Sequence, residues 1–77
     1  NASLDWAMTQ NNRALTLESE AARSNDANLL NEALRRYVAA LDTFTGANNE
    51  LAIQVRENLS IAENRAVEMQ LLMSNSN

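Results

Sequence analysis

The 77-residue sequence contains no cysteine, histidine, lysine or proline, and its single glycine is Gly46. Without cysteine, the chain forms no disulfide and offers no thiolate to a metal ion. Without histidine, it lacks the commonest general base and metal ligand. The absence of proline and the scarcity of glycine leave few points at which a helix has to break.

Aromatic side chains are also scarce, with one tryptophan, one tyrosine and one phenylalanine. Alanine, leucine, glutamate and arginine are plentiful instead, and these residues favour helices. A chain of 77 residues builds one domain with a small core, which is stable only when its helices pack well. The composition therefore predicts a single all-helical domain.

The net charge is −4, and all six basic residues are arginine. An acidic surface disfavours nucleic acid and anionic membranes as partners and favours a basic peptide, although many small soluble domains carry some net charge. No apolar run approaches the ~20 residues of a membrane span, so we expect no membrane insertion. We interpret residues 1–2 as a cloning remnant, residues 3–73 as a domain from a longer protein, and residues 74–77 as a linker.

The most regular helical pattern covers residues 29–44. Apolar residues recur there at steps of four and three, which marks one face of a helix. The residues of this face are Leu30, Leu34, Tyr37, Leu41 and Phe44. Ala33 and Ala40 flank the face and allow a neighbouring helix to come close. Such a helix is not stable alone in water, so the segments on either side are its expected partners.

The first partner helix is predicted over residues 4–24, with Ser3 as its N-cap. Its expected core residues are Leu4, Met8, Leu15 and Ala22, interrupted by Asn11 and Glu18. The other partner is predicted over residues 49–73, capped by Asn48. Its expected core residues are Leu51, Val55, Leu59, Ala62, Ala66, Met69 and Met73.

Two short breaks separate the predicted helices. Asn28 is the expected N-cap of the second helix, and a left-handed Gly46 is expected to end it. Short connections make consecutive helices antiparallel neighbours. The predicted fold is therefore an all-α, up-down-up antiparallel three-helix bundle in which the first and third helices run parallel.

Most kinds of enzyme are excluded by the residues available. No nucleophile–histidine pair, glycine-rich phosphate loop or metal-ligand spacing is present. Glu57, Glu63 and Glu68 share one predicted helix, but glutamates in such positions are usually solvated surface. The same reasoning applies to Glu18 and Glu20. We therefore expect a non-catalytic domain with no cofactor and no metal site.

The outward side of the predicted third helix is more apolar than a solvated surface needs to be. Residues placed at about 100° intervals put Ile53, Val67 and Leu71 opposite the core stripe. Apolar residues rimmed by acids suit an amphipathic helix carrying arginine or lysine, although a helix with two neighbours also has a broad apolar arc. The expected peptide-binding residues are Ile53, Glu57, Ser60, Ile61, Glu63, Asn64, Val67, Glu68, Leu71 and Leu72.

Several segments together resemble the MIT (microtubule interacting and trafficking) domain. They are residues 14–17 (Ala-Leu-Thr-Leu), 26–28 (Asp-Ala-Asn), 32–37 (Glu-Ala-Leu-Arg-Arg-Tyr) and 62–68 (Ala-Glu-Asn-Arg-Ala-Val-Glu). The spacing from Ala14 to Ala33 and Tyr37 is similar to the family pattern without a gap. The resemblance covers roughly residues 7–73.

The resemblance implies a cytoplasmic three-helix bundle that binds the C-terminal tails of ESCRT-III subunits. Such domains recruit ATPases, deubiquitinases, proteases or kinases to endosomal and other membranes that are being remodelled. The tails lie between helices two and three or between helices one and three. Glu63 and Asn64 stand where many members have leucine and aspartate. This departure favours the groove between helices one and three, provided that the side with Ile61 and Leu72 faces helix one.

Two other functions fit the same pattern. One is a structural assembly or oligomerisation unit, in which the apolar outward side of the third helix is a self-interface. The other is a peptide-binding fragment of tetratricopeptide type, since the Glu-Ala-Leu-x-x-Tyr pattern of residues 32–37 also occurs in those repeats. We expect a monomer rather than an oligomer.

Overall fold

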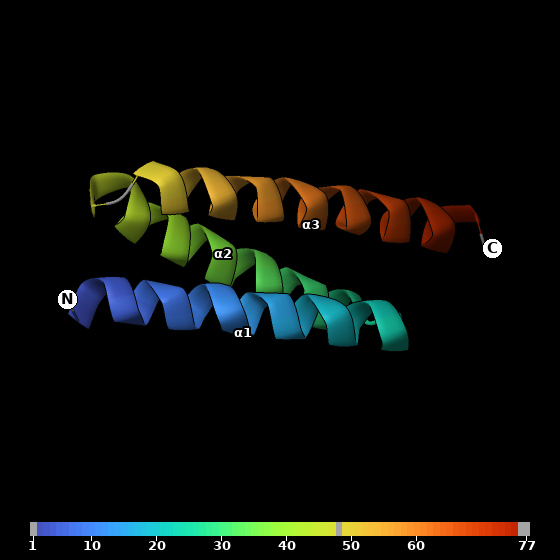
Figure 1. Cartoon of the computed structure of the whole chain (residues 1–77). Helices are drawn as coiled ribbons and strands as arrows, with labels where there is room; N and C mark the ends of the chain where they lie inside the picture. Colours follow the sequence, from blue (N-terminus) through green and yellow to red (C-terminus); the bar gives the residue numbers. More distant parts are fainter. Residues whose placement is uncertain (1, 48, 76–77) are drawn as a thin grey trace.

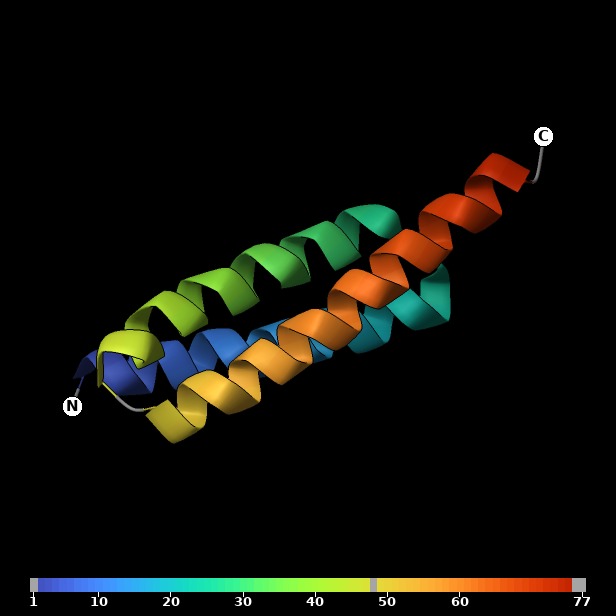
Figure 2. The same cartoon turned by 90° about the horizontal axis from the view of Figure 1, so that it is seen from above.

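The computed structural model describes residues 2–47 and 49–75, which form the helices α1 (Ala2–Ser24), α2 (Ala27–Ala47) and α3 (Asn49–Asn75). α1 and α3 run in the same direction, and α2 runs back and packs against both of them (Figure 1). The molecule is a rod measuring 48 × 17 × 13 Å, seen from above in Figure 2. The predicted all-α, up-down-up three-helix bundle is confirmed. Within the described residues, no helix combines the length and the apolar character needed to cross a membrane.

The connection between α1 and α2 is closed by Asn25 and Asp26. Asn25 has a φ of 54°, the left-handed conformation that commonly ends a helix. The backbone N–H of Asp26 then donates to the carbonyl of Ala21 at 3.1 Å, which satisfies one of the last carbonyls of α1. Asp26 Oδ1 accepts the backbone N–H groups of Asn28 at 2.9 Å and Leu29 at 3.3 Å. The predicted N-cap at Asn28 is therefore wrong, because the carboxylate two residues earlier performs that role.

The predicted end of α2 at Gly46 is also wrong. Gly46 does not have a positive φ, and the helix continues through it to Ala47. A glycine permits the left-handed conformation but does not require it. α2 is consequently longer than the predicted residues 29–44 at both ends.

The remaining helix ends differ slightly from the predictions. α1 begins at Ala2, so Ser3 lies inside its first turn rather than at the N-cap. α3 begins at Asn49, as predicted, and continues to Asn75, so it includes the first half of the predicted linker. The predicted cap at residue 48 and the end of the linker at residues 76–77 lie outside the described residues.

The core of α2 follows the predicted face. Leu30, Tyr37 and Phe44 are fully buried, and Ala33 and Ala40 are buried between them. The other two predicted core residues, Leu34 and Leu41, are partly buried and pack against this core. Leu30, Tyr37 and Phe44 are seven residues apart, which is about two helical turns, so all three lie on one side of α2. This spacing is expected where one helix packs lengthwise against others.

The core of α1 differs from the predicted one. The buried residues are Ala7, Asn11, Ala14, Glu18 and Ala21, spaced by four and three. Three residues predicted to be in the core are exposed instead, namely Met8, Leu15 and Ala22. The two polar residues that seemed to interrupt the core stripe are therefore part of it. Glu18 was expected to be solvated, and this prediction is wrong.

Alanine explains why the buried face of α1 lies where it does. Ala7, Ala14 and Ala21 recur every seven residues and have no exposed surface. Small side chains let helix backbones approach closely, so α1 packs tightly against α2. Larger residues do not fit in this narrow space and lie at its edges, which is where Leu15 is found.

α3 contributes the third side of the core largely as predicted. Ala52, Val55 and Ala62 are buried. Four further residues from the predicted stripe, Leu51, Leu59, Ala66 and Met69, are partly buried against them. The last predicted core residue, Met73, has no described side chain.

A pair of substitutions at neighbouring positions tests the observed face of α1. We expect Ala14→Leu to lower the free energy of unfolding by about 1–3 kcal/mol, because the added side chain overfills a closed space. Leu15→Ala should change it by less than about 1 kcal/mol, because that side chain is 41% exposed. Urea unfolding followed by circular dichroism measures both. A larger loss in Leu15→Ala than in Ala14→Leu would contradict the observed face.

Candidate functional site

A groove about 470 Å³ in volume runs between the parallel helices α1 and α3. Both helices pack closely against α2, whereas they meet each other mainly through side chains that reach across. We call this surface the α1/α3 groove. It is lined by Leu15, Glu18, Ser19, Ala22 and Arg23 of α1 and by Asn58, Ile61 and Arg65 of α3.

The floor of the groove is built around the carboxylate of Glu18, which is only 8% exposed. The hydroxyl of Tyr37, from α2, donates a hydrogen bond of 2.7 Å to Glu18 Oε1. Nε of Arg65, from α3, forms an ion pair of 2.9 Å with Glu18 Oε2. One carboxylate therefore joins all three helices, and each of its oxygens already has a partner. This satisfies the condition under which a buried charge is tolerated.

The burial of Tyr37 affects its ionisation. Burial raises the pKa of the Tyr37 hydroxyl, and the hydrogen bond to Glu18 and the negative charge of Glu18 raise it further. The positive charge of Arg65 lowers the same pKa by a smaller amount. Tyr37 consequently remains a neutral hydrogen-bond donor to Glu18 well above neutral pH.

A second polar contact crosses the groove nearer the amino end of α1. Nδ2 of Asn58 donates to Oδ1 of Asn11 at 3.4 Å, and Asn11 is only 9% exposed. The polar floor is thus largely satisfied by contacts within the bundle. A ligand in the groove does not have to supply these hydrogen bonds.

Each wall of the groove carries an exposed apolar side chain. Leu15 of α1 is 41% exposed and Ile61 of α3 is 53% exposed, although both line the same depression. Single exposed apolar residues are common, but two that face one groove form a contact surface for an apolar side chain. Ile61 thus meets the condition for favouring this groove, whereas Leu72, which the same condition named, does not line it.

The predicted binding residues of α3 are all exposed but do not form one surface. Ile61 lines the α1/α3 groove, and Glu57, Glu68 and Leu72 lie within about 40° of it around the helix. Glu63 instead lines a depression between α2 and α3. The same placement at about 100° per residue directs the remaining five away from both neighbouring helices. These five residues are Ile53, Ser60, Asn64, Val67 and Leu71.

Sequence reasoning missed the half of the groove that α1 provides. Leu15 and Ala22 were expected in the core, and Arg23 carried no signal at all. The step of seven residues between Leu15 and Ala22 indicates one face, but only the neighbouring alanines show that this face lies beside the core. Arg65 and Asn58 were missed because their partners, Glu18 and Asn11, were not expected to be buried.

A smaller depression of about 280 Å³ lies between α2 and α3. It is lined by Leu34, Arg35 and Val38 of α2 and by Leu59 and Glu63 of α3. Its wall is apolar, with Val38 half exposed, but Glu63 contributes a charged group where an apolar partner side chain would sit. The α1/α3 groove is larger and has apolar residues on both of its walls.

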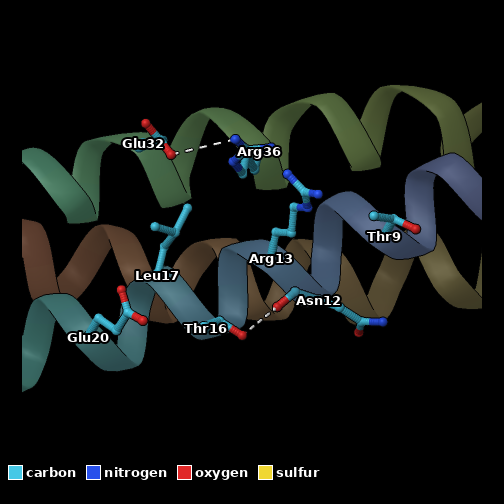
Figure 3. A pocket seen from close by; sticks show the side chains of 8 residues that line it. All are labelled: Thr9, Asn12, Arg13, Thr16, Leu17, Glu20, Glu32 and Arg36. Carbon is cyan, nitrogen blue, oxygen red and sulfur yellow. Dashed lines mark hydrogen bonds and ion pairs between the residues drawn. The ribbon is translucent and has the colours of Figure 1, made fainter.

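The face between α1 and α2 also carries a depression, of about 470 Å³ (Figure 3), in which Arg36 has partners for two of its nitrogens while its buried Nε has none among the described residues. Arg36 donates to Gln10 Oε1 at 2.8 Å and forms an ion pair of 3.5 Å with Glu32. Figure 3 shows Arg13 reaching from α1 toward α2, on the same side as Arg36. This surface is polar and has only one apolar lining residue, Leu17, so it is a weaker candidate for a docking site. In the described parts of the chain, no three acidic side chains gather as a metal site requires.

The single tyrosine allows a test of the Glu18 contacts. At neutral pH we expect Tyr37→Phe to lower the free energy of unfolding by about 1.5–3 kcal/mol, because the buried carboxylate loses a donor. In the unchanged protein, stability should also fall above pH ~10, because tyrosine ionises there in the unfolded chain but not in the folded one. The slope should not exceed about 1.4 kcal/mol per pH unit, since one proton is involved.

The chain has no lysine or cysteine, so Tyr37 is the one side chain whose ordinary pKa lies near 10. Urea unfolding at several pH values between pH ~8 and ~11 measures the slope in both proteins. The Tyr37→Phe variant is the matched control and should show no fall over this range. An equal fall in the variant would contradict the role assigned to Tyr37.

Comparison of the chain with protein-family models, with curated proteins and with solved structures found no match.

Proposed function

We propose that this domain is a non-catalytic interaction module that binds an amphipathic helix in the α1/α3 groove. The observation that carries the proposal is the pair of exposed apolar side chains, Leu15 and Ile61, which face each other across that groove. Apolar anchors of a partner can pack between them and remove both from water. The lining residues span Leu15 to Arg23 and Asn58 to Arg65, about two turns of each helix, and α1 and α3 run in the same direction (Figure 1), which suits a short helical ligand.

The polar floor supports the same proposal. The two oxygens of Glu18 are bonded to Tyr37 and Arg65, so the floor does not need water or ligand to satisfy it. A ligand that covers the groove therefore buries apolar surface without leaving an unpaired carboxylate beneath it. A groove with an unsatisfied charge at its centre would bind an apolar ligand poorly.

The charges beside Ile61 indicate a basic partner. Glu57 and Glu68 are exposed and lie close to Ile61 around α3. Arginine or lysine on the polar side of a docked helix can pair with them. An acidic molecule of net charge −4 also attracts a basic peptide at a distance.

The resemblance to the MIT domain gives this proposal a cellular setting. The partner would be the C-terminal tail of an ESCRT-III-type protein. The domain would bring a larger parent protein, such as an ATPase, protease or kinase, from the cytoplasm to endosomal or other membranes that are being remodelled. The departure of Glu63 and Asn64 from the family pattern favours the α1/α3 groove over the one between α2 and α3.

Titration with fluorescently labelled ESCRT-III tail peptides tests the proposal. We expect at least one peptide of a representative set to bind, and Ile61→Asp to weaken that binding tenfold or more, since it puts a charge into an apolar contact (about 1.4 kcal/mol or more). Val38→Asp is the matched control, because Val38 is equally exposed but lines the depression between α2 and α3. Circular dichroism shows whether each variant remains folded.

Three results would contradict the proposal. They are the absence of binding by every peptide, a greater loss of binding in Val38→Asp than in Ile61→Asp, and unfolding of Ile61→Asp. The second result would transfer the site to the depression between α2 and α3. The third would mean that Ile61 belongs to the core.

The far end of α3 favours a second candidate function, a helical assembly unit. The carboxyl-terminal turns of α3 extend past the ends of α1 and α2 (Figures 1 and 2). Leu71 is 58% exposed and Leu72 is 67% exposed, so more than half of each side chain is open to solvent. A second copy of the chain could pair with this end through the same residues and bury them.

Sedimentation equilibrium distinguishes the two functions. We expect the protein to remain a monomer over a wide range of concentration, because the binding module needs no self-interface. A dimer that forms as concentration rises and disappears in Leu71→Asp would favour the assembly unit instead. Ser60→Asp, on the same outward side but away from the projecting end, is the control for the added charge.

A further inference from the structure

Two arginines line the α1/α3 groove, Arg65 at its floor and Arg23 at its end. Arg23 is in the last turn of α1, and Arg65 is on the facing side of α3. Glu18 is the one acidic residue among those that line the groove, and Arg65 already neutralises it. The lining of the groove therefore carries a positive charge, although the whole chain carries a net charge of −4.

We propose that Arg23 and Arg65 bind an acidic side chain of the amphipathic helix that occupies the groove. This inference rests on the proposed function. It adds that one contact residue of the partner is acidic, and it gives the direction in which the partner helix runs. The partner thus carries basic residues along the side that meets Glu57 and Glu68, and a single glutamate or aspartate at the Arg23 end.

Arg65 is held in position to act in this way. Its Nε is engaged by the buried carboxylate of Glu18 at 2.9 Å, which holds that end of the guanidinium in place. Its side chain is nonetheless 50% exposed, and arginine has five N–H donors, so donors remain at the groove surface. A group that is already oriented loses little conformational freedom when it binds a partner.

Arg23 provides a second charge that is not engaged elsewhere. It is exposed, and among residues 2–47 and 49–75 no ion pair involves it. Three other acidic groups are near. Glu20, three residues before Arg23, lines the depression between α1 and α2, and Asp26 caps α2 with its Oδ1. Glu68 lies one turn beyond Arg65 on α3. Glu68 does not line the groove. The space beside Arg23 and Arg65 is therefore open to a carboxylate of the partner.

The arrangement also limits how a partner can lie. A carboxylate is attracted to the groove lining, which carries Arg23 and Arg65, and is repelled by Glu57 and Glu68, which do not line the groove. Leu15 and Ile61 lie about two turns before Arg23 and one turn before Arg65, respectively. The apolar anchors of the partner therefore precede its acid in space by one to two turns, which gives the bound helix a single direction.

Designed peptides test this inference. Each probe is a C-terminally amidated amphipathic helix of about 20 residues, with a leucine stripe, lysine on its polar side and one glutamate, whose position differs from probe to probe. Every probe has a twin with glutamine in place of that glutamate. We expect one glutamate position to bind about fivefold more tightly than its twin, as a partly exposed ion pair allows.

The Arg23→Gln variant identifies the cause of that preference. It should bring the affinities of the best probe and its twin to within about twofold of each other, because the preference is measured as the ratio between the two in the same variant. Arg13→Gln is the matched control, since Arg13 is an exposed arginine of α1 that lines the opposite face. Arg65→Gln is not used as the main variant because it would leave Glu18 buried with one partner fewer.

The outcomes separate this inference from the proposed function. If Ile61→Asp weakens binding but every glutamate probe equals its twin, the groove binds a helix and the carboxylate inference is wrong. A glutamine twin with a free carboxyl terminus that binds more tightly through Arg23 would likewise contradict it, because the anchor would then be the end of the chain. If no probe binds, or if Ile61→Asp has no effect, the proposed function itself fails.

Discussion

The carboxylate of Glu18 is the interaction on which the rest of the bundle depends. It lies in the core face of α1, accepts a hydrogen bond from Tyr37 of α2 and pairs with Arg65 of α3. α1 and α3 pack less closely with each other than with α2, so this ion pair and the bond between Asn11 and Asn58 define how far apart they lie. The same separation creates the α1/α3 groove. One buried acid thus governs both the closure of the core and the width of the candidate site.

The architecture could be predicted from the sequence because α2 has a strong pattern. Leu30, Tyr37 and Phe44 are large and regularly spaced, and they are the buried side chains around which the other helices pack. The number, direction and approximate limits of the helices follow from that pattern and from the short connections. The exact capping residue did not follow, since Asn28 and Asp26 are both good N-caps and only the hydrogen bonds of Asp26 distinguish them.

The candidate site could be predicted only in part, because half of it depends on the face that α1 turns toward the core. Hydrophobicity favours a face containing Met8 and Leu15, whereas close packing against α2 requires alanine. In the structure the alanine face is buried, so the larger residues Met8 and Leu15 lie on the surface. Ile61 could be found from the pattern of α3 alone. Its counterpart Leu15 could not, since its exposure depends on contacts between helices.

The seven-residue repeat of alanine in α1 has a consequence for the alignment of the helices. Ala7, Ala14 and Ala21 are equivalent surfaces, so a shift of α1 along α2 by seven residues, about 10 Å, would again bring alanine against alanine. The polar residues between them are not equivalent. The same shift would replace the carboxylate of Glu18 by the amide of Asn11 beside Tyr37, and would separate Glu18 from Arg65. The alanines therefore allow several alignments, and the charged residue among them selects one.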